Sequence, residues 1–220
     1  MDCRNGIIAS GSQDNAVKIW DIEKKKGWTF EGRHSNQINH VLLWDDFSAF
    51  SSSADKTIRH FDIRDWGNPN ENFTEDSETL NGYQFSKYFM GHKRSITNIL
   101  RLHNSHTRLV SSSEDASIKI WDLYANEYCD YSNSNIVGNR FNANTEVIEP
   151  LVSLEGENEH QSGIGRLCIN SKYLASFSLQ DCCLIVRDWE RPKDHLIKLE
   201  NFNSVLGVAE NKRSNIFDIS

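Results

Sequence analysis

The residues of this chain that could do chemistry are a histidine, a serine and an aspartate: His92, Ser111 and Asp115. A serine hydrolase uses these three residue types, because the carboxylate orients the imidazole and the imidazole takes the proton of the attacking hydroxyl. The same types return upstream in the same order, at positions 34, 51 and 55. Since an active site is not built as a repeat, the recurrence favours a structural role. The sequence therefore predicts no catalytic residue and no enzyme.

No cofactor or metal site is predicted either. Gly163-Ile164-Gly165 lacks the third glycine and the strand-to-helix context of a phosphate-binding loop. His103 and His106 are three residues apart, but no third metal ligand lies near them in the sequence.

Composition and charge restrict the class of partner. The 220 residues carry a formal net charge of −7, whereas a protein that binds nucleic acid needs a basic patch. No apolar run approaches the length of a membrane span, and no segment like a signal peptide opens the chain. The five cysteines form no C-x-x-C pair, and their odd number argues against a secreted disulfide framework. We therefore expect protein partners, no nucleic acid and no membrane, in the cytoplasm, the nucleus or both.

The elements that must position the serine, histidine and aspartate side chains are copies of one sequence unit. Each copy is a strand of small residues, an aspartate turn, and an alternating strand that ends in a two-residue signature. The copies cover Ile7–Ile22, Phe47–Ile63, Arg108–Leu123 and Tyr173–Trp189. Six residues separate the turn aspartate from the signature in every copy: Asp14 to Trp20, Asp55 to Phe61, Asp115 to Trp121, and Asp181 to Arg187.

A histidine and a further apolar strand precede three of the copies. The histidines are His34, His92 and His160, and they come 21 to 23 residues before the turn aspartate. Asp14 and Asp55 are 41 residues apart, which is typical of a propeller blade with four strands. The later periods are longer because the chain carries two insertions.

These copies resemble the WD-repeat family, most clearly from Gly91-His92 to Trp121-Asp122. The resemblance implies an all-β propeller of antiparallel four-stranded sheets. It also implies that histidine, serine, aspartate and tryptophan form a hydrogen-bonded tetrad in each blade. The tetrad positions are His92, Ser111, Asp115 and Trp121 in the best copy; His34, Ser51, Asp55 and Phe61; Ser10, Asp14 and Trp20; and His160 and Asp181.

The copies are unequal. Phe61 cannot donate a hydrogen bond, so Asp55 is expected to pair with His34 and Ser51 alone. In the last copy Phe177 and Arg187 stand where the serine and tryptophan are expected, so that His160 and Asp181 lack the rest of the tetrad. Arg187 is expected to pair with a carboxylate.

The propeller is expected to be incomplete, with about four blades' worth of sheets. No first strand is expected before Ile7, and the residues after 200 match the start of another blade. The expected units are 1–33 (partial), 34–91, 92–159, 160–200 and 201–220 (partial), with long loops over 64–85 and 124–148. Three explanations stay open: a fragment or degenerate remnant of a longer gene, pairing with another propeller arc, or imperfect closure of the chain on itself.

The resemblance implies a protein-interaction scaffold whose partners dock on the narrow top face of the propeller. Residues there come from the start of each first strand and from just before each turn aspartate. These positions hold Gln37, Asn39, Ser95, Thr97, Arg94, Gln13, Glu114 and Gln180. Because the set is polar and nearly uncharged, it indicates no strong electrostatic preference for a partner.

A narrower resemblance concerns SSSEDASIKIWDL, the long insertion after it and the next histidine-led blade. These are similar to the C-terminal blades of fungal F-box/WD-repeat receptors, which bring phosphorylated proteins to a ubiquitin ligase. Such receptors bind phosphate through top-face arginines, but the matching positions here are Asn39, Thr97 and Gly165, with Arg94 only nearby. The alternatives are therefore a phosphoprotein-binding component related to SCF-type ubiquitin ligases, or a truncated non-functional remnant of one.

Overall fold

A computed structural model describes residues 1–63, 87–102, 105–123, 147–156, 159–188 and 196–199. The regular elements in these ranges are all β-strands, arranged in four sheets. Within the same ranges, no helix has the length and apolar character that crossing a membrane requires.

The first sheet consists of four antiparallel strands in chain order. They are β1 (Asp2–Arg4), β2 (Ile7–Gly11), β3 (Val17–Asp21) and β4 (Lys26–Phe30). The expectation that no strand precedes Ile7 is wrong, because β1 pairs with the start of β2. Asn5 and Gly6 form the connection with positive φ values of 46° and 76°, the conformation of the two-residue turn that favours a tight hairpin.

The other three sheets repeat this order of strands. The second contains β5 (Ile38–Leu43), β6 (Ser48–Ser53), β7 (Ile58–Asp62) and β8 (Tyr88–Phe89). The third contains β9 (Ile96–Arg101), β10 (Arg108–Ser113), β11 (Ile118–Asp122) and β13 (Val152–Leu154). The fourth contains β14 (Arg166–Ile169), β15 (Tyr173–Ser178), β16 (Cys183–Asp188) and β17 (Leu196–Leu199).

An additional strand, β12 (Val147–Ile148), extends the second sheet by pairing parallel to β8. The long loop expected over 124–148 is therefore two residues too long, because its last two residues form this strand. Ile148 is only 1% exposed and packs in the core between the second and third sheets, which explains why the chain returns to the second sheet before it adds β13 to the third. The loop expected over 64–85 lies outside the described residues.

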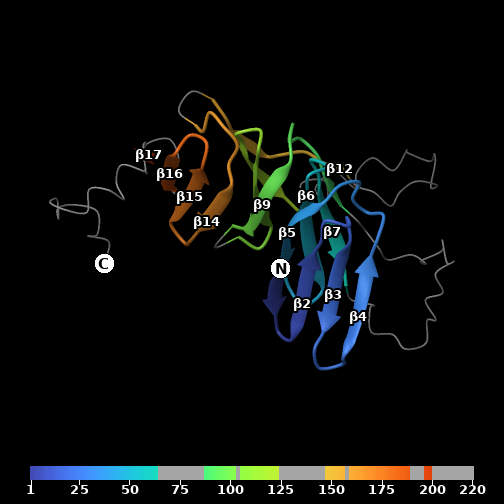
Figure 1. Ribbon diagram of the computed structural model, residues 1–220. Coiled ribbons are helices and arrows are strands. Elements are labelled where there is room, and N and C mark those ends of the chain that lie inside the picture. The colour runs from blue at the N-terminus through green and yellow to red at the C-terminus, as the bar shows by residue number, and fades with distance from the viewer. Residues whose placement is uncertain (64–86, 103–104, 124–146, 157–158, 189–195, 200–220) are drawn as a thin grey trace, which may run out of the picture.

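The sheets stand side by side, and the face of each one packs against the next. Apolar cores fill the three junctions, and the strands β1, β5, β9 and β14 are neighbours along the inner side of the arc. Figure 1 shows the β1–β4 sheet and the β14–β17 sheet at opposite ends of this arc. The expected all-β fold, an incomplete propeller, is confirmed. The further blade expected over 201–220 lies outside the described residues.

Candidate functional site

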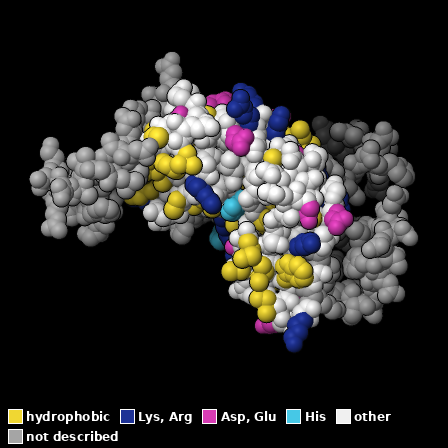
Figure 2. Space-filling model, in the orientation of Figure 1, with side chains coloured by type: hydrophobic (Ala, Val, Ile, Leu, Met, Phe, Trp, Pro, Cys, Tyr) yellow, Lys and Arg dark blue, Asp and Glu magenta, His cyan; other side chains and the backbone are white. Residues whose placement is uncertain are grey.

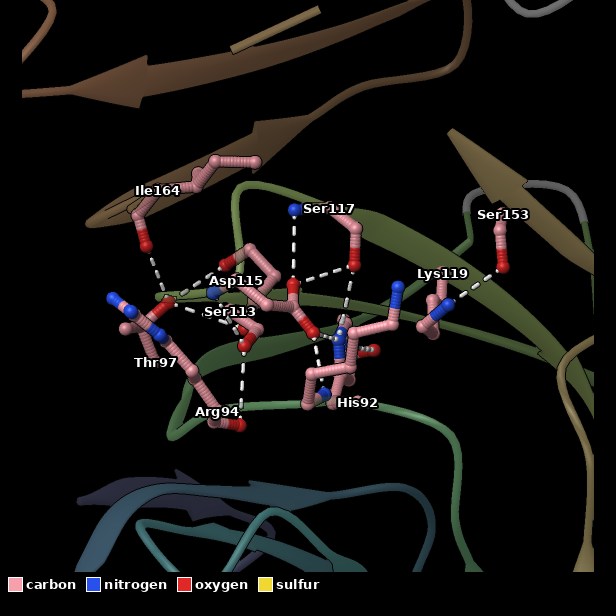
Figure 3. Close-up of polar contacts among 12 residues, drawn as sticks. His92, Arg94, Thr97, Ser113, Asp115, Ser117, Lys119, Ser153 and Ile164 are labelled. Atoms are coloured by element: carbon pink, nitrogen blue, oxygen red, sulfur yellow. Dashed lines mark hydrogen bonds and ion pairs between the residues drawn. The ribbon is translucent and has the colours of Figure 1, made fainter. Parts of the chain in front are cut away.

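The third sheet holds the most extended polar network, built on His92 (Figure 3). His92 precedes β9, and its Nδ1 lies 2.9 Å from Oδ2 of Asp115 in the β10–β11 turn. Its Nε2 lies 2.8 Å from Oγ of Ser111, and the indole Nε1 of Trp121 donates to the same Oγ at 2.8 Å. The structure thus brings together four side chains from a loop, two strands and a turn.

The charge states in this network follow from burial and hydrogen bonding. Burial disfavours the charged imidazole and lowers the pKa of His92, although Asp115 acts in the opposite direction. Burial also acts to raise the pKa of Asp115, but hydrogen bonds from His92 and Ser117 outweigh it and hold that pKa well below its usual range. A neutral imidazole therefore donates from Nδ1 to a carboxylate, while Nε2 accepts from the Ser111 hydroxyl.

Burial separates this network from a hydrolase triad. The His92 side chain and Ser111 are both 0% exposed, so no substrate reaches the serine oxygen. That oxygen also accepts the indole hydrogen bond of Trp121, which engages an oxygen lone pair that a nucleophilic serine would need for its attack. The geometry is that of a closed hydrogen-bonded chain that joins the loop, the strands and the turn.

The second sheet repeats the network without the indole. His34 Nδ1 lies 2.8 Å from Asp55, and His34 Nε2 lies 2.6 Å from Ser51. Phe61 is 5% exposed and fills the place of the tryptophan with an apolar ring. Asp55 pairs with His34 and with Thr57 rather than with Ser51: Thr57 Oγ1 donates to its Oδ1 at 2.6 Å, whereas Ser51 contacts His34.

The fourth sheet corrects one expectation. Ser176, not Phe177, takes the serine position, and its Oγ lies 2.9 Å from His160 Nε2. The β15–β16 turn is one residue longer than the β10–β11 turn, which shifts the serine to five residues before Asp181. The contact from His160 Nδ1 to Asp181 is also longer, at 3.6 Å.

Arg187 stands at the tryptophan position of the fourth sheet, where burial lowers its pKa to about 10. It is 2% exposed, and its guanidinium forms an ion pair with Glu159. This carboxylate is the kind of partner that the sequence suggested for Arg187. A charged pair thus replaces the indole and serine bond of the third sheet.

The first sheet has no histidine to complete its set. Asp14 is exposed and accepts a hydrogen bond from the backbone N–H of Ala16 at 3.0 Å. Ser10 donates to the carbonyl of Lys18 at 3.4 Å, and Trp20 is 46% exposed. These three side chains therefore form no tetrad.

The sequence did not predict two kinds of hydrogen-bond donor to the turn aspartate. The residue two positions after the aspartate, Thr57 or Ser117, donates its hydroxyl to the carboxylate at 2.6 Å. The backbone N–H that follows the histidine also donates to it, from Ser35 at 3.1 Å and from Lys93 at 2.7 Å. The hydroxyl was visible in the sequence as a recurring Asp-x-Thr/Ser pattern, whereas the backbone donors depend on how the loop folds.

We define the top face as the end of the arc that carries the loops before β5, β9 and β14 and the turns with Asp14, Asp55, Asp115 and Asp181. Two residues that are predicted to bind partners there also join neighbouring sheets. Asn39 Nδ2 donates to Ser95 Oγ at 2.9 Å and to the Ile96 carbonyl at 2.8 Å. Thr97 Oγ1 donates to the Ile164 carbonyl at 2.6 Å.

The remaining expected top-face residues divide by exposure. Gln37 and Ser95 are half-buried, and their carbonyls accept the backbone hydrogens of Ala54 and Glu114. The exposed members are Gln13, Arg94, Glu114 and Gln180. Lys93 and Gln161, which the sequence reasoning did not select, are also exposed there. No cluster of metal-ligating side chains occurs among the described residues.

Two segments of the chain, residues 2–21 and 83–122, match the family described as WD domain, G-beta repeat. These two segments are similar to WD repeats. The chain is 29% identical to the anaphase-promoting complex subunit cdh1 of Dictyostelium discoideum over 54% of this chain and 14% of that protein. It is 30% identical to cell division control protein 4 of Saccharomyces cerevisiae over 56% of this chain and 16% of that protein.

A third relative is shorter. The WD repeat-containing protein 53 homolog of Dictyostelium discoideum is 30% identical over 53% of this chain and 40% of that protein. The chain thus spans less than half of the length of each of these relatives.

Proposed function

We propose that this chain is a non-catalytic protein-interaction scaffold of the WD-repeat type that binds partners on its top face. The observation that carries the proposal is that the turn carboxylates of the second, third and fourth sheets each fix an exposed loop. Asp115 accepts the backbone hydrogen of Lys93, Asp55 that of Ser35, and Asp181 that of Gln161. The loops that reach solvent are therefore held in place by the interior of the sheets.

Fixed loops suit binding because they lose little conformational entropy when a partner docks. The exposed side chains of the top face carry charges of both signs: Lys93 and Arg94 are positive, and Glu114 is negative. Mixed polar side chains of this kind favour another protein over the phosphate backbone of a nucleic acid, which requires a basic surface. We place the scaffold in the cytoplasm or the nucleus, in keeping with the free cysteines among the described residues.

A matched pair of double variants tests the scaffold. Lys93→Ala/Arg94→Ala removes two exposed cations from the top face, while Arg108→Ala/Lys172→Ala removes two from the opposite end of the sheets. After affinity capture and mass spectrometry, we expect the top-face variant to lose the proteins that the unchanged chain and the other variant retain. Equal recovery of those proteins with all three forms would contradict the proposal.

A second candidate is a receptor for phosphorylated proteins, related to ubiquitin-ligase substrate receptors. Arg94 favours it, because its guanidinium is exposed and makes no hydrogen bond or ion pair within the described part of the chain. Asn39 and Thr97 weigh against it, since these positions join neighbouring sheets. Phosphatase treatment of the lysate separates the two candidates: only a phosphate receptor loses its captured proteins.

A further inference from the structure

The junctions between sheets follow one rule, which the strand registers define. We call the face that carries Val110, Ile118 and Ile120 in the third sheet the forward face, because it packs on the fourth sheet. We call the face that carries Leu109 and Trp121 the backward face, because it packs on the second sheet. At every junction, the forward face of one sheet meets the backward face of the next.

The first sheet presents its backward face to solvent. Its register pairs Ile8 with Trp20, as that of the third sheet pairs Leu109 with Trp121. Trp121 is 0% exposed at its junction, whereas Trp20 is 46% exposed. The same residue type at the same position is thus covered in one sheet and open in the other.

The fourth sheet carries the matching forward face. The positions of Val110, Ile118 and Ile120 are taken there by three more apolar residues: Ala175, Leu184 and Val186. These residues are half-buried, whereas Val110 and Ile118 are 0% exposed and Ile120 is 7% exposed. Figure 2 shows hydrophobic side chains gathered over the β14–β16 sheet and over the β1–β3 end of the first sheet.

We propose that a second copy of this chain covers both faces. Two interfaces would form, and a two-fold axis would relate them. In each interface, the forward face of one copy's fourth sheet would pack on the backward face of the other copy's first sheet. Two arcs of four sheets then close a ring of eight, within the range of roughly four to eight blades that propellers adopt. A second copy is the occupant that the structure favours, because the chain already forms this junction three times with itself.

The registers also identify which inner-strand residues meet across a junction. In the third and fourth sheets the pair is Leu100 and Ile169, which share a core. In the first and second sheets it is Asp2 and Leu43, where Asp2 Oδ2 accepts the Leu43 backbone hydrogen at 2.7 Å. The next pair in this series, between two copies, is Cys168 and Cys3.

These cysteines offer a direct test, because both are free and exposed. The test uses the full chain with Cys129→Ser and Cys182→Ser, so that only Cys3, Cys168 and the buried Cys183 remain. We expect a mass of two chains in light scattering and a covalent dimer after treatment with a short bis-maleimide. Adding Cys3→Ser or Cys168→Ser should abolish the crosslink in each variant alone, and mixing the two variants should restore it.

Surface variants supply the second arm. Trp20→Glu and Val186→Glu place a charge on the two faces, and each should yield monomers that still melt cooperatively. Phe47→Glu, at a side chain that is 57% exposed elsewhere, is the matched control and should remain dimeric. If the unchanged chain is a monomer, the proposal is overturned. This outcome includes the case in which residues of the same chain beyond Leu199 cover the face. A crosslink that persists in Cys3→Ser or Cys168→Ser alone overturns it as well.

Discussion

Trp121→Ala is expected to lower the free energy of unfolding by about 3 to 5 kcal/mol, which is the usual cost of deleting a buried aromatic side chain. Trp121 is 0% exposed and packs edge-on against Phe89 in the core between the second and third sheets. Its loss leaves a cavity and removes the indole donor of Ser111. Since the free energy of unfolding of a domain is only about 5 to 15 kcal/mol, the denaturant concentration at the midpoint of unfolding should shift strongly.

Trp20→Ala is the matched control, because Trp20 holds the same register position in the first sheet and is 46% exposed. It should cost less than about 1 kcal/mol, as exposed positions usually do. Both variants should be measured at a dilution where the melting temperature no longer depends on protein concentration. Equal losses for the two tryptophans would contradict the packing described for the third sheet.

Asp115→Ala is expected to cost about 3 kcal/mol, because it leaves several buried donors without their acceptor. The carboxylate accepts from His92 Nδ1 at 2.9 Å, from Lys93 N at 2.7 Å, and from both the Ser117 backbone N at 3.0 Å and the Ser117 Oγ at 2.6 Å. Differential scanning calorimetry at neutral pH measures the effect, since the carboxyl group is ionised there.

The control for this change is Asp14→Ala in the first sheet. Asp14 occupies the same turn position but is exposed and accepts from the backbone N–H of Ala16 without a histidine. Its replacement should shift the melting temperature far less than that of Asp115. If the two changes had equal effects, the histidine network would contribute nothing to stability.

Much of this fold could be predicted from residue spacing. The interval from His92 to Trp121 located a loop, three strands and a turn, and the structure brings the histidine, serine, aspartate and tryptophan side chains together. Such spacing is informative because the distances between the residues along the strands fix which side chains meet. The strand β1 was missed because only its Asn5-Gly6 turn signals it, and the strand itself is three residues long.

Other features depend on contacts that no local pattern contains. Ser176 was missed because the β15–β16 turn is one residue longer, and register cannot be read from a fixed count when a turn changes length. The roles of Asn39 and Thr97 were missed because their partners, Ile96 and Ile164, belong to the next sheet. The return of β12 to the second sheet likewise follows from the burial of Ile148 rather than from its immediate neighbours.

The turn carboxylates of the second, third and fourth sheets hold the exposed loops of the top face, and native-state hydrogen exchange measures this directly. The backbone N–H groups of Ser35, Lys93 and Gln161 lie in exposed loops but donate to Asp55, Asp115 and Asp181 at 3.1, 2.7 and 2.9 Å. We predict that the Lys93 amide exchanges slowly, with protection close to that of the β10 and β11 strands, and that His92→Gln removes this protection. If the Lys93 and Ser35 amides of the unchanged chain exchange at the rate of an unstructured peptide, the carboxylates do not hold these loops.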